Sequence, residues 1–334
     1  MAKEARWWKK GEDKFAICNL CRRRCMIAPG RRGYCGIREN RDGKLYAIAY
    51  GKAVSYMIDP IEKKPFFHFM PGTQVFSFAT VGCNFRCLHC QNWDISQQKL
   101  DIIGDDLSPE EIVRLSKGRA DGIAYTYTEP TVFMEYALDT AKLAKKEGLY
   151  NVFVTNGYMT PEAIKSMGDI DAARVDLKAF DQKFYDRVCG GVDMEGVLDS
   201  IKKLHKKMHI EIINLLIPGE NDMPEQIMQL AEWVAKLDKS VPLHFTSFYP
   251  AYRMMDKQRT PISTLLRARE IAMEAGMKYV YTGNIRNKET ESTYCYKCRA
   301  MLIERSGFDV ERIMLEGDRC PHCGAKQNIV VKVG

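Results

Sequence analysis

Residues 83–90 read Cys83-Asn84-Phe85-Arg86-Cys87-Leu88-His89-Cys90, directly after the apolar run 75–80. The run is rich in Val and Phe, as expected of a buried strand. Three thiolates at the spacing C-x3-C-x2-C can hold three irons of a cubane cluster and leave the fourth iron without a protein ligand. An open iron can bind a substrate or a cofactor. The alternative for these cysteines is a zinc site that lacks one ligand.

The sequence on both sides of this stretch predicts a parallel sheet. Runs rich in Val, Ile, Phe and Tyr, without strict alternation, fit strands buried on both faces. They are residues 75–80, 122–127, 151–155, 173–177, 211–216, 243–248 and 279–281. Helix starts with a capping residue and a proline lie between them, as at Ser108-Pro109-Glu110-Glu111. These βα units predict an α/β fold, a full or partial (β/α)6-type TIM barrel, with functional groups at the carboxyl ends of the strands.

The composition is that of an ordinary globular protein. Hydrophobic residues make up 46% and charged residues 28% of the 334 residues, which argues against wholesale disorder and against a membrane-spanning class. The basic N-terminus has no apolar run behind it, so we expect no secretory signal and a cytoplasmic protein. Because disulfides are disfavoured in a reducing cytosol, the close groups that contain 11 of the 12 cysteines predict metal ligation. Cys189 stands outside the groups and is interpreted as a small buried residue, with a hydrogen-atom donor thiol as the alternative.

Two further cysteine groups flank the predicted barrel and suggest three domains, 1–74, 75–285 and 286–334. The C-terminal group, C-x2-C-x21-C-x2-C, predicts a tetrahedral site for structural zinc or a rubredoxin-like iron. Its ligands are Cys295, Cys298, Cys320 and Cys323. The N-terminal group fits a four-thiolate zinc site or an auxiliary Fe–S cluster, and zinc is preferred because nothing nearby repeats a ferredoxin pattern. Its members are Cys18, Cys21, Cys25 and Cys35.

Polar residues follow several predicted strands and are candidates for binding a cofactor. They are His89, Glu129, Asn156, Asp176, Lys178, Asn214 and His244. Asp176 and Lys178 are two residues apart, so both should point to the same side of the strand end. Simpler interpretations exist for three of these features. Asp176 and Lys178 could form a surface salt bridge, Glu129 could be a carboxylate at a helix N-terminus, and His244 could be a hydrogen-bonded core histidine.

The spacing of the central cysteines resembles the defining motif of radical S-adenosylmethionine (SAM) enzymes. The wider sequence resembles the AmmeMemoRadiSam-system radical SAM enzymes, which are related to pyruvate formate-lyase activating enzymes. The similar stretches are residues 18–35, the run 59–65, and 82–94 with Gln91-Asn92-Trp93. This resemblance covers nearly the whole chain.

The resemblance implies a [4Fe–4S] cluster on Cys83, Cys87 and Cys90 whose open iron binds the amino and carboxylate groups of SAM. The reduced cluster would cleave SAM to a 5′-deoxyadenosyl radical, which removes a hydrogen atom from a substrate. It also implies that Glu129 accepts from the SAM ammonium, although Tyr-Thr-Glu stands here in place of the family's Gly-Gly-Glu. Asp176 and Lys178 resemble an Asp-x-Lys element that contacts SAM. His89 is expected beside the adenine, and Asn156, Asn214 and His244 are the remaining candidate contacts.

The resemblance leaves the substrate open between a protein and a small molecule. It implies a flavodoxin- or ferredoxin-type electron donor, and AMMECR-type and Memo-type proteins as candidate partners. Activation of a glycyl-radical enzyme ranks second, because a minimal activase does not need the outer domains. A non-catalytic Fe–S electron-transfer adaptor is the alternative from another functional class. Lys and Arg outnumber Asp and Glu by 50 to 43, but Arg6–Lys10 is the one stretch that interleaves basic and aromatic residues, so nucleic acid is a minor candidate.

Overall fold

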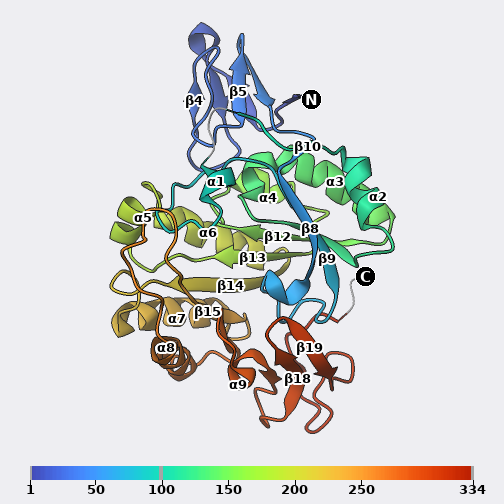
Figure 1. Ribbon diagram of the computed structural model, residues 1–334, viewed down its shortest axis with the longest axis vertical. Helices are drawn as coiled ribbons and strands as arrows, with labels where there is room; N and C mark the ends of the chain where they lie inside the picture. Colours follow the sequence, from blue (N-terminus) through green and yellow to red (C-terminus); the bar gives the residue numbers. More distant parts are fainter. Residues whose placement is uncertain (1, 98–100, 332–334) are drawn as a thin grey trace. The chain divides into compact units, whose positions relative to one another are not determined.

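The computed structural model describes residues 2–97 and 101–331, which divide into two compact units (Figure 1). Unit 1 consists of Met1–Asp59, Gln74–Ala173 and Glu195–Met208. Unit 2 consists of Pro60–Thr73, Arg174–Met194 and His209–Gly334. The segment 75–285, predicted as one domain, therefore contributes to both units.

The sheet of unit 1 contains parallel strands at the predicted positions. Strands β9 (Gln74–Ala79) and β12 (Tyr150–Thr155) pair in parallel with β11 (Gly122–Tyr125), and the strand order is β12-β11-β9-β8, with β8 at Ser55–Pro60. β11 and β12 are buried throughout, as expected for strands covered on both faces. Since Tyr125 lies opposite both Phe78 and Phe153, the three strands end at nearly the same level. The segments that follow them therefore meet at one edge.

The helices of unit 1 begin where the capping signals predict. α2 (Pro109–Ser116) opens with a complete capping box, in which the Ser108 hydroxyl accepts from Glu111 N–H and the Glu111 carboxylate accepts from Ser108 N–H. α2 lies beside α3 (Met134–Lys146), as Figure 1 shows. The other helical segments are α1 (Trp93–Ser96), η3 (Pro130–Phe133), α4 (Pro161–Lys165) and α6 (Met194–His205).

Short antiparallel strands form the N-terminal part of unit 1. One three-stranded sheet has the order β1-β6-β5, with β1 at Lys3–Glu4, β5 at Arg38–Arg41 and β6 at Lys44–Ala47. A second has the order β2-β3-β4, with β2 at Trp8–Lys10, β3 at Ala16–Cys18 and β4 at Met26–Ile27. The remaining elements are η1 (Glu12–Lys14) and the pair β7 (Lys52–Ala53) and β10 (Asp105–Asp106).

Unit 2 repeats the parallel βα pattern. β14 (His209–Leu216), β15 (Leu243–Ser247) and β16 (Val280–Gly283) pair in parallel, and α7 (Pro224–Asp238) lies beside α8 (Ile262–Glu274). β13 (Ala172–Asp176) spans the boundary between the units. The short helical elements are η2 (Ile61–Lys63), α5 (Gln182–Val188) and α9 (Lys288–Glu291). β17 (Thr293–Tyr294), β18 (Met301–Ser306) and β19 (Asp309–Ile313) form the C-terminal antiparallel sheet. The predicted α/β class is confirmed.

Within residues 2–97 and 101–331, no helix combines the length and the apolar character that crossing a bilayer requires.

His68 is a buried histidine of unit 2 with a partner on each ring nitrogen. Nδ1 lies 2.7 Å from the carbonyl oxygen of Asn328, and Nε2 lies 2.6 Å from the Tyr281 hydroxyl. A carbonyl oxygen can only accept, so Nδ1 carries the proton and Nε2 accepts from Tyr281. Burial lowers the pKa of His68 to about 3, because a second ring proton would bring a charge into an enclosed site.

We expect acid to destabilise unit 2 through His68. Between pH 6.5 and about 3 the unfolded chain protonates this residue and the folded chain does not, so stability falls as the pH is lowered. Each pH unit in this window costs about 1.4 kcal/mol, or about 2 kcal/mol between pH 6.5 and 5. Urea unfolding of the wild type and a His68→Gln variant at pH 7, 6 and 5 measures the effect. The variant should show a shallower pH dependence, and His205→Gln on α6 is the control. Equal slopes in all three proteins would contradict the prediction.

Candidate functional site

The central cysteines lie on a tightly packed loop that leaves β9 at its carboxyl end. Gly82 opens the loop with φ +96°, and a Cβ there would lie 2.6 Å from the carbonyl oxygen of Cys35, so only glycine fits. Phe85 N–H donates to Cys83 Sγ at 3.3 Å. At the other end of the loop, Cys90 Sγ lies 3.1 Å from Ser96 Oγ of α1. The loop therefore holds its thiols in a defined arrangement.

The negative charges around these thiols favour the binding of a cationic group. Burial raises the pKa of Cys83 well above its usual value, and the negative charges of Glu129, Cys87 and Cys90 raise it further. The three thiols are therefore close enough to oppose one another's ionisation. Their deprotonation requires a positive partner, and an iron–sulfur cluster supplies one. Three cysteine sulfurs with no fourth thiolate on the same loop fit the three-ligand set predicted from the sequence.

Glu129 is a buried carboxylate that ties the end of β12 to the start of η3. Its Oε1 accepts from the Thr131 N–H at 3.0 Å, from the Thr131 hydroxyl, and from the Thr155 hydroxyl at 2.6 Å. Its Oε2 accepts from Asn156 N–H at 2.7 Å. Three of these donors converge on Oε1 and one on Oε2, so Oε2 keeps one of its two acceptor positions. Glu129 therefore positions residues 155–156, and it is also the helix N-terminal carboxylate considered from the sequence.

Tyr127 occupies the first position of the Tyr-Thr-Glu element and adopts φ +60°. This left-handed conformation favours glycine, which is the residue that the resembled element has at this position. Two contacts hold the tyrosine there. Its hydroxyl donates to Asp59 at 2.6 Å, and its carbonyl accepts from the side chain of Asn92 at 2.7 Å. The tyrosine thus adopts a backbone conformation that glycine would also accept.

Asn156 links the end of β12 to the cysteine loop. Its Nδ2 donates to Asn84 Oδ1 at 2.7 Å and lies 3.9 Å from Cys83 Sγ. Its Oδ1 accepts from Tyr158 N–H at 3.0 Å. Cys83, Glu129 and Asn156, predicted from three separate stretches of sequence, therefore lie together in unit 1.

In unit 2, Asp176 lies between two cations. Lys178 Nζ is 2.6 Å from Asp176 Oδ2, and the Arg174 guanidinium binds Asp176 Oδ1. The three residues are spaced by two, so they share one side of the strand end, as predicted for Asp176 and Lys178. Asn214 Nδ2 donates to the carbonyl oxygens of Leu177 and Lys178, at 2.7 and 3.1 Å. Asn214 thus fixes the backbone that carries Lys178.

His244 lies near the amino end of β15, away from the carboxyl edge where cofactor contacts were predicted. Its Nε2 is 2.7 Å from Glu211 Oε2, and its ring packs edge-on against Phe67. Burial lowers the pKa of His244. Burial alone would raise the pKa of Glu211, but hydrogen bonds with His209 and His244 hold it well below its usual value. The structure therefore assigns His244 the core role that was the alternative to a binding role.

The C-terminal cysteines form a compact four-sulfur group. Cys295 Sγ is 3.6 Å from Cys323 Sγ, Cys298 Sγ is 3.6 Å from Cys320 Sγ, and all four sulfurs lie within 4.8 Å of one another. Zinc–sulfur bonds of about 2.3 Å in a tetrahedron place sulfurs about 3.8 Å apart, which agrees with these distances. The predicted four-cysteine site is confirmed, and its geometry fits zinc.

Removing the C-terminal metal is expected to unfold this end of the chain. The buried cluster there is small, with Leu302, Ile303 and Ile329 beside the cysteines. Metal binding must therefore supply most of the folding free energy, which is about 10–16 kcal/mol in zinc-finger peptides. A chelator or a Cys320→Ser substitution should release one zinc and make residues 295–331 sensitive to limited proteolysis. A proteolysis pattern that is unchanged after zinc loss would contradict the prediction.

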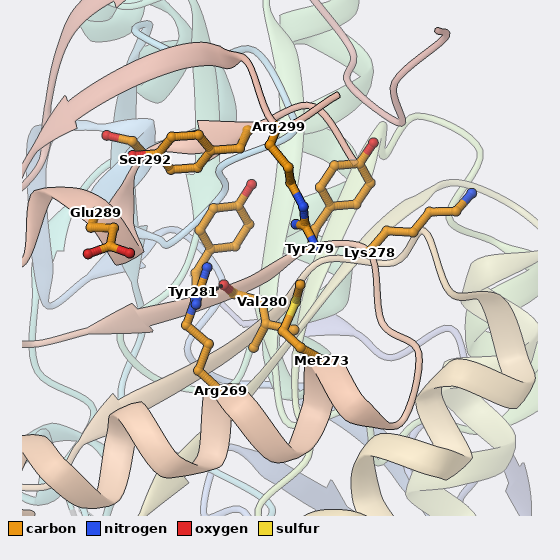
Figure 2. A pocket seen from close by; sticks show the side chains of 10 residues that line it. Arg269, Met273, Lys278, Tyr279, Val280, Tyr281, Glu289, Ser292 and Arg299 are labelled. Carbon is orange, nitrogen blue, oxygen red and sulfur yellow. Dashed lines mark hydrogen bonds between the residues drawn. The ribbon is translucent and has the colours of Figure 1, made fainter. Parts of the chain in front are cut away.

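A separate pocket of about 740 Å³, including its open mouth, lies in unit 2. Figure 2 shows Arg269 and Met273 projecting from α8 on one side of it, with Tyr279 and Tyr281 above them. The pocket contacts Lys278 and Tyr279, so it lies toward the amino end of β16. In βα folds the functional groups gather at the opposite ends of the strands. We therefore do not assign the predicted chemistry to this pocket.

The sequence profile of the Radical SAM superfamily matches residues 78–234. The chain is 46% identical to the uncharacterized protein MJ0808 of Methanocaldococcus jannaschii, over 98% of this chain and 100% of that protein. Residues 78–234 therefore form a radical SAM domain. The α/β core with a partial, barrel-like parallel sheet predicted from the sequence is therefore confirmed.

Other relatives of this radical SAM protein carry more informative names. The putative glycyl-radical enzyme activating enzyme MJ1632 of M. jannaschii is 27% identical, over 59% of this chain and 76% of that protein. The pyruvate formate-lyase 1-activating enzyme of Escherichia coli K12 is 26% identical, over 49% of this chain and 69% of that protein. These matches confirm the predicted relation to activating enzymes. Streptococcus suis SuiB bound to its precursor peptide SuiA has a TM-score of 0.51 at 12% identity, covering 71% of this chain and 55% of that one, and it shows the fold alone.

Sequence reasoning missed several residues that position this radical SAM site. Asn84 and Ser96 contact the cluster cysteines, and Arg174 binds Asp176. Asn84 lies inside the cysteine motif and could have been chosen for its position. Ser96 and Arg174 carry no local signal, because their partners are decided by how the loop and the strand end fold.

A Glu129→Gln substitution is expected to lower activity about 10- to 100-fold, the usual cost of losing an outer-shell partner. In either orientation the new amide places its N–H groups against a backbone N–H, that of Asn156 or that of Thr131, which cannot accept. Residues 155–156 must then shift relative to Cys83. Reductive SAM cleavage by the reconstituted protein measures the effect, and Glu162→Gln on the exposed start of α4 is the control. Full activity of the Glu129 variant would contradict this role.

Proposed function

We propose that this protein is a radical SAM enzyme that cleaves SAM reductively and uses the resulting radical to take a hydrogen atom from a protein or a small molecule. The observation that carries the proposal is the meeting of three cysteines with the polar ends of β11 and β12. Cys83 lies beside Asn156, and Glu129 holds Asn156 in place. In this arrangement a reactive iron would lie next to hydrogen-bonding groups at the carboxyl ends of the strands.

Each residue has a defined part in this proposal. Cys83, Cys87 and Cys90 hold the [4Fe–4S] cluster, which when bound with SAM supplies one electron to the sulfonium and yields a 5′-deoxyadenosyl radical. Asn84 and Asn156 fix the position of Cys83, and His89 packs beside the adenine. Glu129 positions residues 155–156, and the second acceptor position of its Oε2 is proposed to accept from the SAM ammonium.

Asp176 and Lys178 are proposed as SAM contacts. Arg174 neutralises Asp176, and Asn214 secures the backbone at Lys178. Two cations hold the Asp176 carboxylate in a fixed direction, and the Lys178 ammonium has further N–H donors for a ligand carboxylate. We leave His244 out of the proposed site, because Glu211 already engages it.

The substrate is proposed to be an unidentified protein or metabolite, within an AmmeMemoRadiSam system that includes AMMECR-type and Memo-type partners. A flavodoxin- or ferredoxin-type protein would supply the electron. Activation of a glycyl-radical enzyme is the second candidate. It is favoured by two relatives at 26–27% identity, a putative glycyl-radical enzyme activating enzyme and a pyruvate formate-lyase activating enzyme.

Anaerobic reconstitution with iron and sulfide tests the proposal. With dithionite and SAM, the protein should release 5′-deoxyadenosine, and SAM should change the EPR spectrum of the reduced cluster. A non-catalytic electron-transfer adaptor would show a cluster signal that SAM leaves unchanged, and that result would overturn the proposal. Deuterium transfer into 5′-deoxyadenosine from proteins captured in anaerobic extract would then identify the substrate position.

A further inference from the structure

We propose that the pocket toward the amino end of β16 binds a small anionic ligand, a carboxylate or a phosphate ester on an apolar body. The anion would bind two arginines of the lining, Arg269 on α8 and Arg299 beside the C-terminal cysteine group. The described lining residues include none of those proposed to bind SAM. The proposal is therefore independent of SAM cleavage.

The pocket has room for a small molecule. Its cavity volume is about 280 Å³, close to the lower end of the roughly 300–1,000 Å³ range of small-molecule sites. The lining comes from α8, from residues 278–281 and from residues 289–299, all within unit 2. In Figure 2, Arg269 extends from α8 and Arg299 extends from the opposite wall. The two guanidinium groups thus belong to one pocket but to different elements.

Arg269 presents a fixed guanidinium to this pocket. Its Nε donates to the carbonyl oxygen of Val280 at 3.1 Å, which holds the side chain against the start of β16. Its two terminal nitrogens have no hydrogen-bond or ion-pair partner among residues 2–97 and 101–331. A planar guanidinium with both terminal nitrogens available matches two oxygens of a carboxylate or a phosphate. Arg269 therefore has the geometry to bind an oxyanion.

Arg299 reaches the pocket from the C-terminal cysteine group. It directly follows Cys298 and adopts φ +61°, a left-handed conformation that glycine adopts most easily. Its N–H closes the turn by donating to the carbonyl oxygen of Cys295 at 3.0 Å. In the part of the chain that the structure describes, its guanidinium has no hydrogen-bond or ion-pair partner. The turn alone does not explain an arginine here, whereas an anionic ligand does.

The lining carries three cations and one acid. The acid is Glu289 on the exposed start of α9. The third cation is Lys278, whose Nζ lies 3.1 Å from Ser240 Oγ and 4.4 Å from the centre of the Tyr296 ring. Its ammonium therefore contributes charge, while the two arginines supply free donors. An excess of positive charge in a pocket attracts anions.

The remaining walls are apolar. Met273 and Val280 line the pocket beside the rings of Tyr279 and Tyr281. The Tyr279 hydroxyl donates to Gln327 at 2.9 Å, and the Tyr281 hydroxyl donates to a buried histidine at 2.6 Å. Neither partner is part of the lining, so both tyrosines offer ring carbons to a ligand. An aromatic or aliphatic part of the ligand can pack against this wall.

Calorimetric titration of the full-length, reconstituted and zinc-loaded protein with phenyl phosphate, benzoate and inorganic phosphate tests the proposal. Phenyl phosphate or benzoate should bind with a Kd of about 1 mM or lower. Inorganic phosphate lacks the apolar body and should bind at least about tenfold more weakly. The tighter aromatic probe tells whether a phosphate or a carboxylate fits the site. Absence of binding by both aromatic probes would overturn the proposal.

Four variants assign the binding to this pocket. Arg269→Gln and Arg299→Gln should each weaken binding of the tighter probe at least about tenfold, because each removes a charged donor. Arg267→Gln on α8, which pairs with Glu270, is the matched control and should bind like the wild type. Glu289→Gln should tighten binding about two- to fivefold, since it removes the acid of the lining. Weaker binding in the Glu289 variant, or unchanged binding in both pocket arginine variants, would contradict an anionic ligand here.

Limited proteolysis gives a second readout. A ligand that binds both guanidinium groups connects α8 to the C-terminal cysteine group. A saturating concentration of the tighter probe should therefore slow cleavage within residues 295–331. This protection should be absent from the Arg299→Gln variant, whose own zinc content should equal that of the wild type. Protection that persists in the variant would overturn the role of Arg299 in connecting the two elements.

Discussion

A Cys87→Ala variant is expected to release 5′-deoxyadenosine no faster than a protein-free control. Cys87 supplies one of three protein ligands to the proposed [4Fe–4S] cluster, and the fourth iron must stay open for SAM. With only two thiolates, two of the four irons have no protein ligand, so we expect the cluster to be lost together with about four irons per chain. Anaerobic assays with dithionite and SAM measure the release, and iron analysis of the same sample measures the cluster.

The matched control is Cys189→Ala. Cys189 is buried at the end of α5, outside the three cysteine groups. Its substitution should leave the iron content and the release of 5′-deoxyadenosine at wild-type levels. Undiminished release from the Cys87 variant would overturn the assignment of the cluster site. Loss of activity in the Cys189 variant with full iron content would instead favour a hydrogen-donor role for that thiol.

A Glu135→Leu variant is expected to be about 3–5 kcal/mol less stable than the wild type, because it leaves a buried guanidinium without its counter-charge. Arg38 of β5 donates to Glu135 Oε1 at 2.8 Å and also binds Oε2, and both side chains are at most 2% exposed. Arg38 also donates to the carbonyl oxygen of Val132 at 3.2–3.3 Å. Urea unfolding of unit 1, followed by circular dichroism, measures the change in free energy.

The double variant Arg38→Met, Glu135→Leu is the control for this pair. Removing both charges should restore much of the stability lost in the single variant, because no uncompensated ion remains buried. Some loss should persist, since Arg6 N–H also donates to Glu135 Oε1. Zinc and iron are measured in each sample, because Arg38 lies beside Cys18 and Cys35. A single variant as stable as the double variant would contradict the prediction.

Much of the fold could be predicted because its signals are local. The ends of the seven observed parallel-sheet strands lie within two residues of the ends of the predicted runs. Runs of β-branched and aromatic residues indicate strands that are buried on both faces. The capping box at Ser108 was predicted, as its partner Glu111 is three residues away. The position of Asp176 and Lys178 on the same side of the strand end was also predicted from local sequence. Side chains two residues apart in an extended chain point to the same side.

The contacts that could not be predicted join residues far apart in the chain. Arg38 pairs with a glutamate 97 residues away, and His68 with a carbonyl 260 residues away. His244 has a core role because it hydrogen-bonds Glu211 on a neighbouring strand. The sequence shows only that a histidine lies on a strand, and this does not tell a ligand-binding histidine from a buried one. The role of Glu129 could not be predicted either, because its carboxylate accepts from Thr131 in η3 and from Thr155 and Asn156 at the end of β12.

The cysteine groups show the same division. The sequence by itself determined which cysteines belong together, because ligands of one metal site on one loop must be close in sequence. It also identified the radical SAM domain, because the spacing C-x3-C-x2-C lies within a single loop. Only the tertiary structure decided that the four C-terminal sulfurs lie at the spacing of a tetrahedral zinc site, with two pairs at 3.6 Å. This spacing depends on the sheet β17-β18-β19 and on the buried cluster of Leu302, Ile303 and Ile329, which bring residues 295–298 and 320–323 together. Such tertiary contacts are not determined by the spacing of the cysteines along the chain.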